Sequence, residues 1–295
     1  MIVTINTDKL KFEQQFEEQM IAVSDNEKIR ILSFIPENND ILSSSKMPII
    51  FIGGWLALTE SYYEIIDYFL KDGHKVIYIE TREKNSSTAT EESDLTGERM
   101  FRDVQEILYK LDINEPFIML GHSLGAICSL LQAMEEENSR FIPSRIIALQ
   151  PVIESVIQKE QIAVFKLPTW LFKGIRKLMV KIAPFFSSKL KESEYSRERF
   201  EREFLEADPG KMRKSALGFS DFSLLDYLRE IDIPVLFLGI SEDEQHPIAD
   251  SITLTEMLPN TEFHDLVSEE VAFSIKTAKL TLDFLQKCEF SSFLP

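Results

Sequence analysis

Residues 116–126 read PFIMLGHSLGA, in which a serine stands between two glycines shortly after an apolar run. Within this stretch, residues 121–125 (GHSLG) match the G-x-S-x-G pattern of a sharp turn between a strand and a helix. The glycines let the helix and the neighbouring strand approach each other, because they carry no side chain. The pattern alone arises easily by chance, but here it follows a strand-like run and opens an apolar helix. We therefore predict a strained nucleophile elbow with Ser123 at its tip.

Apolar runs typical of buried strands alternate with helix-like stretches on both sides of the elbow. Strands are predicted at 48–54, 74–80, 116–120, 144–151, 234–239 and 261–266, and helices at 61–71, 97–111, 126–134, 249–257 and 273–286. Because helices of this length join successive strands, we expect right-handed crossovers and a mainly parallel sheet. Residues 18–36 predict a β-hairpin that turns at 24–26, and the polar residues 37–46 predict a loop.

The alternation of strands and helices stops near Pro151 and resumes at Ile233, and the stretch between them is rich in helical patterns. We therefore divide the chain into a first core part at 1–151, a helical insertion at 152–230 and a last core part at 231–295. The expected fold class is α/β.

The composition is that of an ordinary globular protein, with 44% apolar and 27% charged residues in a chain of 295. A net charge of −17 argues against broad nucleic-acid binding, which needs clustered cations. Cys128 and Cys288 lie far apart, so two buried thiols in a reducing compartment are favoured over a disulfide. The N-terminal residues show no secretory signal, and no apolar run approaches the length of a membrane span. We expect a cytoplasmic protein.

Several stretches outside the insertion resemble the α/β-hydrolase family. Residues 51–55 (FIGGW) resemble its oxyanion loop, with Ile52 in place of the usual histidine. Residues 78–83 (YIETRE) resemble its D-x-R-G strand ending, with Glu80 and Arg82 in the acidic and basic places. Asp103 falls in the helix before the elbow, where the family often carries an acid. The resemblance implies an α/β-hydrolase fold: a mainly parallel central sheet, helices on both faces, and a helical cap or lid in the insertion.

The resemblance also implies acyl-transfer chemistry with Ser123 as the nucleophile. The backbone N–H of Leu124, together with that of Gly54 or of Trp55, would stabilise a tetrahedral oxyanion. Residues 233–238 resemble the strand that delivers the catalytic acid, and the loop SEDEQHP after it offers Asp243. Glu242 in the same role, or a solvated acidic loop with no role, are the alternatives.

The histidine expected from the family pattern is missing. In this family it lies on the loop after the final strand, and counting forward along the chain reaches residues 269–271, which are Glu-Glu-Val. Glu270 would need a raised pKa to serve as the base for a serine hydroxyl. The conventional base is therefore unassigned.

The chain has four histidines that can be weighed in turn. We expect His74 to be exposed to solvent, and His122 to be a structural residue that points away from the serine. His264 falls inside the final strand, and His246 lies three residues after Asp243 near the sheet edge where the site should be. His246 and His264 are the candidate bases, with ordinary structural roles as the alternative for each.

The insertion contains an amphipathic segment at 166–191, with seven basic residues and no acidic one. Five apolar residues recur at three- and four-residue spacing: Leu171, Ile175, Leu178, Ile182 and Phe185. Three lysines, at 173, 177 and 181, form a separate row, while Trp170 and Phe186 lie near the ends. Such a helix can lie in a membrane interface. We favour the alternative, in which the apolar face packs on the core and the lysines face water. The mixed charges of 191–211 predict a solvated helix.

These observations favour a serine hydrolase, esterase-like or lipase-like, that acts on a carboxylic ester or thioester of a hydrophobic acyl group. No metal or organic cofactor is implied. One alternative is a catalytically weak or inactive relative that binds an apolar small molecule. The other is a peripheral membrane protein that uses the basic segment at 166–191 for a weak contact with the membrane surface.

Overall fold

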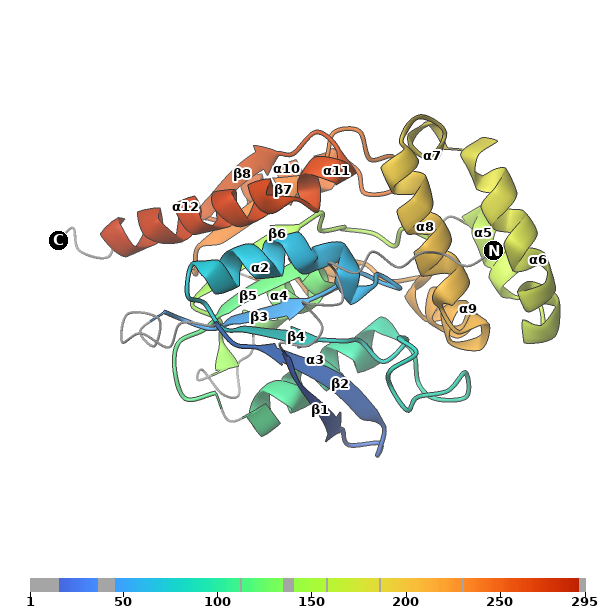
Figure 1. Cartoon of the computed structure of the whole chain (residues 1–295), viewed down its shortest axis with the longest axis horizontal. Coiled ribbons are helices and arrows are strands. Elements are labelled where there is room, and N and C mark those ends of the chain that lie inside the picture. The colour runs from blue at the N-terminus through green and yellow to red at the C-terminus, as the bar shows by residue number, and fades with distance from the viewer. Residues whose placement is uncertain are drawn as a thin grey trace.

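The computed structural model describes residues 16–36, 46–111, 113–134, 141–157, 159–185, 187–229 and 231–291. The N-terminal segment 1–15, most of the expected loop at 37–46 and Phe186 lie outside these residues. At the centre is an eight-stranded sheet in the order β1-β2-β4-β3-β5-β6-β7-β8 (Figure 1). Its strands are β1 (Phe16–Ala22), β2 (Lys28–Phe34), β3 (Ile49–Ile52), β4 (Val76–Ile79), β5 (Ile118–His122), β6 (Arg145–Leu149), β7 (Val235–Gly239) and β8 (Thr261–Asp265).

The sheet is mainly parallel, as predicted. The hairpin β1–β2 joins antiparallel to β4, and all pairs from β4 to β8 run parallel. Every residue of β3, β4, β5 and β7 is buried, which is why these strands read as unbroken apolar runs rather than as alternating patterns. The predicted fold class is confirmed.

Helices cover both faces of the sheet (Figure 1). On one face α2 (Tyr63–Lys71) and α12 (Ile275–Ser291) pack against the central strands. On the other face lie α3 (Gly97–Leu111), α4 (Leu124–Gln132) and α10 (Ile248–Met257). Short turns η2 (Thr59–Tyr62) and α11 (Glu269–Ala272) precede α2 and α12. The helix α3 has the bounds expected from its apolar periodicity. The predicted strands of the parallel part of the sheet are one to three residues longer than the observed ones, except that the strand predicted at 116–120 is observed two residues later, at 118–122.

Between β6 and β7 the chain forms a group of helices at one end of the molecule, which we call the cap helices (Figure 1). They are α5 (Lys159–Phe165), α6 (Thr169–Ile182), η4 (Ala183–Phe185), α7 (Ser188–Glu192), α8 (Glu194–Glu206), α9 (Pro209–Phe219) and η5 (Leu224–Asp226). Ser193 and Asp208 cap α8 and α9, because their side chains accept backbone N–H groups of the first turn. The cap helices have an apolar cluster of their own, which includes Phe165, Phe172 and Phe204.

The expectation that 191–211 forms a solvated helix was wrong. The segment is divided among α7, α8 and α9, and one side of α8 faces inward. Ser196 and Phe204 are buried, and the guanidinium carbon of Arg199 lies 4.2 Å from the ring centre of Phe273 in the core. The sequence pattern did not indicate this inward-facing side of α8, because Arg199, which contacts the core there, is itself a charged residue.

The preferred orientation of the amphipathic helix was also wrong. In α6 the side chains that pack inward are those of Phe172 and Val180. Leu178, Ile182 and Phe185, which were expected to face the core, are exposed. The helix therefore has one apolar side that packs and a second apolar side that does not.

His74 is buried rather than exposed. Its Nδ1 donates a hydrogen bond to the carbonyl oxygen of Met47 at 2.8 Å, and burial lowers the pKa of the ring. Both cysteines are free thiols, with Cys128 buried and Cys288 half-buried. Within the described part of the chain, no helix combines the length and the apolar character needed to cross a bilayer.

Candidate active site

Ser123 lies in the sharp turn between β5 and α4, with φ 50° and ψ −110°. This positive φ is strained for a residue with a side chain, and the two flanking glycines make the turn possible. A Cβ atom at Gly121 would lie 2.1 Å from the carbonyl oxygen of Gly125, and one at Gly125 would lie 2.0 Å from the carbonyl oxygen of Ile52. Neither position has space for a larger residue, so the sequence pattern follows directly from the packing of the elbow.

A histidine and an aspartate lie in line with this serine. The Nε2 atom of His246 is 2.9 Å from the Oγ atom of Ser123, and its Nδ1 atom is 3.0 Å from Oδ2 of Asp243. The side chain of Asp243 is fully buried. The three side chains thus have the hydrogen-bonded order, serine to histidine to aspartate, that is able to activate a serine hydroxyl.

Asp243 and His246 come from one short turn after β7. Oδ1 of Asp243 accepts the backbone N–H groups of Gln245, at 2.8 Å, and of His246, at 3.3 Å. An aspartate that binds the backbone a few residues further on closes a tight turn. Because this turn folds the chain back on itself, a histidine only three residues after the acid can reach both Asp243 and Ser123.

The second candidate base does not join this site. His264 lies on the edge strand β8, and its Nε2 atom contacts Oε1 of Glu262 at 2.6 Å. At the position where the family pattern expects the histidine, Glu269 is buried and forms an ion pair with Arg199 of α8, while Glu270 is exposed. The loop after β8 therefore contacts the cap helices instead of supplying a base.

One of the two oxyanion donors was wrongly assigned. The backbone N–H of Gly54 donates to the hydroxyl of Tyr62 at 2.9 Å, so it is already used. The N–H groups of Trp55, the alternative named from the sequence, and of Leu124 make no hydrogen bond within the described residues. The indole of Trp55 donates to Oγ of Ser215 on α9 at 2.9 Å, which ties this loop to the cap helices.

A buried chain of hydrogen bonds links the oxyanion loop to Asp243. The hydroxyl of Tyr62 is 2.7 Å from Nδ1 of His122, and Nε2 of His122 is 3.1 Å from Oε1 of Gln150. The side-chain amide of Gln150 then donates to Oδ2 of Asp243. Since Oε1 of Gln150 can only accept, His122 carries its proton on Nε2 and accepts from Tyr62 at Nδ1.

His122 is structural, as expected, and stays uncharged in the folded protein. Burial, followed by the nearby charge of His246, holds the pKa of His122 well below its usual value. Gln150 and Tyr62 were not identified from the sequence. The signal for Gln150 was its place directly after β6, since site residues gather at the carboxyl ends of parallel strands.

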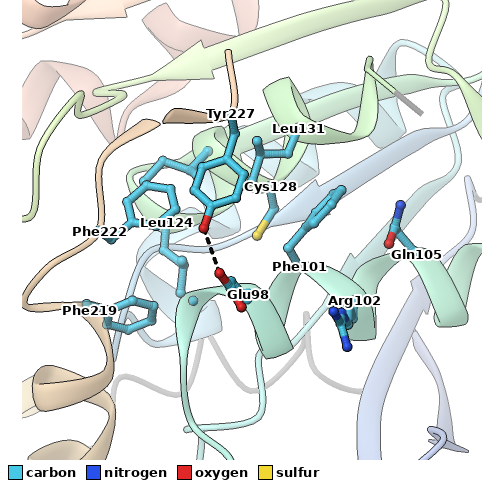
Figure 2. Close-up of a pocket in the computed structure, with 12 residues that line it drawn as sticks. Glu98, Phe101, Arg102, Gln105, Leu124, Cys128, Leu131, Phe219, Phe222 and Tyr227 are labelled. Atoms are coloured by element: carbon cyan, nitrogen blue, oxygen red, sulfur yellow. Dashed lines mark hydrogen bonds between the residues drawn. The ribbon is translucent and has the colours of Figure 1, made fainter. Parts of the chain in front are cut away.

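A cavity of about 290 Å³ lies beside the elbow, between α3, α4 and the cap segment 219–227 (Figure 2). Its lining is largely apolar and includes Phe101, Leu124, Ile127, Cys128, Leu131, Phe219 and Phe222. Tyr227 donates a hydrogen bond to Glu98 at 2.6 Å across it. Burial raises the pKa of Cys128 to about 12, so this thiol is neutral and inert. Leu124, whose N–H lies at the elbow, extends its side chain into this space.

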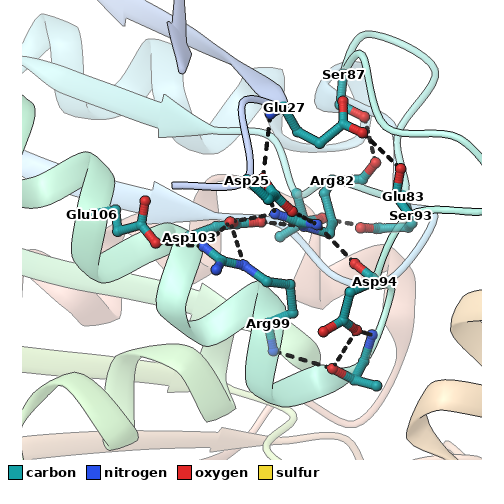
Figure 3. A network of polar contacts seen from close by, with 12 residues as sticks. Asp25, Glu27, Arg82, Glu83, Ser87, Ser93, Asp94, Arg99, Asp103 and Glu106 are labelled. Atoms are coloured by element: carbon teal, nitrogen blue, oxygen red, sulfur yellow. Dashed lines mark hydrogen bonds and ion pairs between the residues drawn. The ribbon is translucent and has the colours of Figure 1, made fainter. Parts of the chain in front are cut away.

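The arginine of the D-x-R-G-like segment has a structural role. Arg82 is fully buried and forms ion pairs with Asp103 of α3 and with Asp25 in the turn of the β1–β2 hairpin (Figure 3). It also donates to the carbonyl oxygen of Asp94 at 2.8 Å. Burial alone would raise the pKa of Asp25, but the hydrogen bond and charge of Arg82 outweigh it and lower that pKa. The network fixes the hairpin to the helix that precedes the elbow.

Comparisons with known proteins agree with the overall fold. A family model described as "alpha/beta hydrolase fold" matches residues 47–274. A hydrolase from Pseudomonas aeruginosa has a TM-score of 0.71 at 17% identity, covering 91% of this chain and 98% of that one. An esterase from Exiguobacterium antarcticum has a TM-score of 0.66 at 18% identity, covering 84% and 90%. An enol-lactonase from Burkholderia xenovorans has a TM-score of 0.69 at 14% identity, covering 91% and 100%. A search of curated protein sequences found no match.

Proposed function

The chain belongs to the alpha/beta hydrolase fold family, and from that premise we propose that it is a serine hydrolase of carboxylic esters or thioesters. The observation that carries the proposal is the contact of His246 with Ser123 on one side and with Asp243 on the other. A weak or inactive relative was an alternative because the base was missing from its usual place and because Ile52 replaces the usual histidine of the oxyanion loop. His246 bears on the first of these points, since it supplies an imidazole at hydrogen-bonding distance from the serine.

In the proposed reaction the Oγ atom of Ser123 attacks the ester carbonyl while Nε2 of His246 takes its proton. Asp243 holds the imidazole with Nδ1–H directed at its carboxylate and stabilises the imidazolium that forms. The backbone N–H groups of Leu124 and Trp55 stabilise the tetrahedral oxyanion. His246 then gives the proton to the leaving alcohol or thiol, which leaves an acyl-enzyme. Water, deprotonated by the same histidine, releases the acid and regenerates Ser123.

We propose a hydrophobic acyl group as the substrate portion nearest the elbow. The apolar cavity of about 290 Å³ shares Leu124 with the oxyanion site and is small for a ligand pocket. A short or medium acyl chain fits such a space better than a bulky polar group. Chain-length preference in a series of p-nitrophenyl esters tests this part, and Leu131→Phe, which would narrow the cavity, should shift the preference to shorter chains.

Reaction with a fluorophosphonate probe tests whether the serine is activated. Wild-type protein should be labelled, and Ser123→Ala should abolish the label. His246→Ala should slow labelling by about a thousandfold or more, because loss of the base removes most of the rate that the triad supplies. His264→Ala is the matched control, since it removes a histidine that is hydrogen-bonded to Glu262 of its own strand, and it should leave the rate unchanged. No labelling of the wild type after prolonged reaction would overturn the proposal.

A further inference from the structure

The outer side of the α6–η4 segment carries large apolar side chains in contact with solvent. Trp170 is 75% exposed and Phe185 is 84% exposed, and between them Leu178 and Ile182 are also exposed. Single exposed apolar residues are common on proteins, but a group of this kind marks an interaction site. We propose that this segment, residues 166–185, is a docking surface for a lipid bilayer that carries anionic headgroups. The inference does not depend on the proposed function.

The arrangement around the helix gives this surface its amphipathic form. With 3.6 residues per turn, Trp170, Leu178 and Ile182 fall within an arc of about 120°. Lys173, Lys177 and Lys181 flank or enter one margin of this arc, and all three are exposed. On the far side of the helix Phe172 and Val180 pack into the apolar cluster of the cap helices. The helix is therefore held by one side and presents apolar and basic groups together on the other.

The charge of the surface is opposite to that of the chain as a whole. Residues 166–185 contain five basic residues and no acidic one, in a protein with 49 acidic and 32 basic residues, and one of the five, Arg176, donates to the backbone carbonyl oxygens of Leu205 and Ala207. An anionic bilayer repels most of such a protein, so attraction is confined to this segment and fixes the orientation of the docked molecule. Lysine side chains at the margin bind headgroups while tryptophan and phenylalanine enter the interface.

A bilayer fits this surface better than a second copy of the chain. A symmetric dimer through α6 would place the same patch on both subunits face to face, and with it two rows of lysines. Contact between this patch and the acidic remainder of another copy would be head-to-tail, and it would produce a ring or an open chain of copies rather than a dimer. In Figure 1 α6 is the outermost of the cap helices, at the end of the molecule opposite α12, so a flat surface can reach it.

Tryptophan emission provides a direct test, since the chain has two tryptophans and Trp170 is the exposed one. The protein is mixed with phosphatidylcholine vesicles, with or without 30 mol% phosphatidylglycerol. With anionic vesicles we expect cosedimentation and a blue shift of the emission, both weakened by high salt. Trp170→Phe should abolish the shift while sedimentation persists. Absence of sedimentation with anionic vesicles at low salt would overturn the proposal.

Variants test the basic and the apolar side chains of the surface separately. Replacing Lys173, Lys177 and Lys181 by Gln should weaken partitioning by about a hundredfold, from the typical contribution of each basic residue near an anionic surface. Leu178→Ser with Phe185→Ser removes two exposed apolar side chains of the surface and should abolish binding. The matched control is Ile252→Ser with Met257→Ser, which removes two exposed apolar side chains from α10 and should bind normally.

The same variants test whether a second copy of the chain, rather than a bilayer, binds this surface. Sedimentation velocity at several concentrations measures the oligomeric state of the wild type and of the Leu178→Ser, Phe185→Ser variant. A monomeric wild type that binds vesicles supports the proposal. A wild-type dimer that the variant dissociates, with no vesicle binding by either protein, would assign the surface to a second copy and overturn it.

Discussion

Arg199 joins the cap helices to the core, and its removal should be costly. Its guanidinium forms an ion pair with the buried Glu269, lies 3.3 Å from Glu203 on its own helix, and covers the ring of Phe273. Burial alone would lower the pKa of Arg199, but the charges of Glu203 and Glu269 outweigh it and raise that pKa. The arginine is thus charged, and the pair is a buried contact between α8 and the segment after β8.

The cost of Arg199→Met can be worked out from these contacts. Breaking one side of a buried ion pair leaves an uncompensated carboxylate and costs about 3–5 kcal/mol. The side chain of Arg199 is 16% exposed, which allows some water to reach Glu269 and favours the lower end of that range. Loss of the contact with Phe273 adds about 1 kcal/mol. We expect Arg199→Met to lower the free energy of unfolding by about 4 kcal/mol in total.

Urea unfolding followed by circular dichroism measures this loss. The matched control is Arg202→Met on the same helix, where the side chain is 48% exposed and its ion pair with Glu206 spans 3.4 Å. That variant should lose about 0.5 kcal/mol or less. The double variant Arg199→Met, Glu269→Met removes both charges and should recover at least about 2 kcal/mol. Equal losses for Arg199→Met and Arg202→Met, or an additive double variant, would refute the reasoning.

Three further predictions concern the site and its surroundings. Gln150→Leu takes a hydrogen bond from Asp243 and should slow fluorophosphonate labelling about tenfold, at a cost of about 2 kcal/mol in stability. Burial lowers the pKa of His122 in the folded protein, so below about pH 6.5 this side chain is protonated in the unfolded chain but not in the folded one. The free energy of unfolding therefore falls as the pH is lowered. Urea unfolding at pH 6 and at pH 5 measures how the free energy of unfolding changes with pH. In His122→Gln this change should be smaller than in the wild type by about 1.4 kcal/mol per pH unit. Ser215→Ala removes the acceptor of the Trp55 indole and should cost about 1 kcal/mol, with a several-fold fall in the rate of ester hydrolysis.

Most of the framework could be predicted from the sequence, because it depends on local patterns. The bounds of α3 follow from its apolar periodicity, and the elbow follows from two glycines that have no space for a Cβ atom. Asp243 was the favoured acid because residues 233–238 resemble the strand that delivers the acid in the α/β-hydrolase family, although Glu242 remained an alternative. These features need only a few neighbouring residues, so no knowledge of distant contacts was required.

The remaining features depend on the path of the backbone and on contacts between distant segments, which a sequence pattern does not show. His246 reaches Ser123 only because the carboxylate of Asp243 closes a turn on its own backbone, which spacing alone does not reveal. Gln150 adopts a positive φ of 48°, for which a glutamine gives no sequence signal. In α6 the periodicity indicates apolar residues on more than one side, but the side that packs is decided by Phe165 and Phe204, which arrive from other helices.

Placing the acid and the base on one turn has a consequence for the rest of the molecule. In the α/β-hydrolase family the loop after the final strand supplies the catalytic histidine. Here the corresponding loop, after β8, does not. In this protein it supplies Glu269, the core-side partner of Arg199. The proposed proton transfer and the attachment of the cap helices thus depend on separate loops, one after β7 and one after β8. Substitutions at Glu269 can therefore weaken the attachment of the cap helices while the hydrogen bonds within the Asp243–His246 turn are retained.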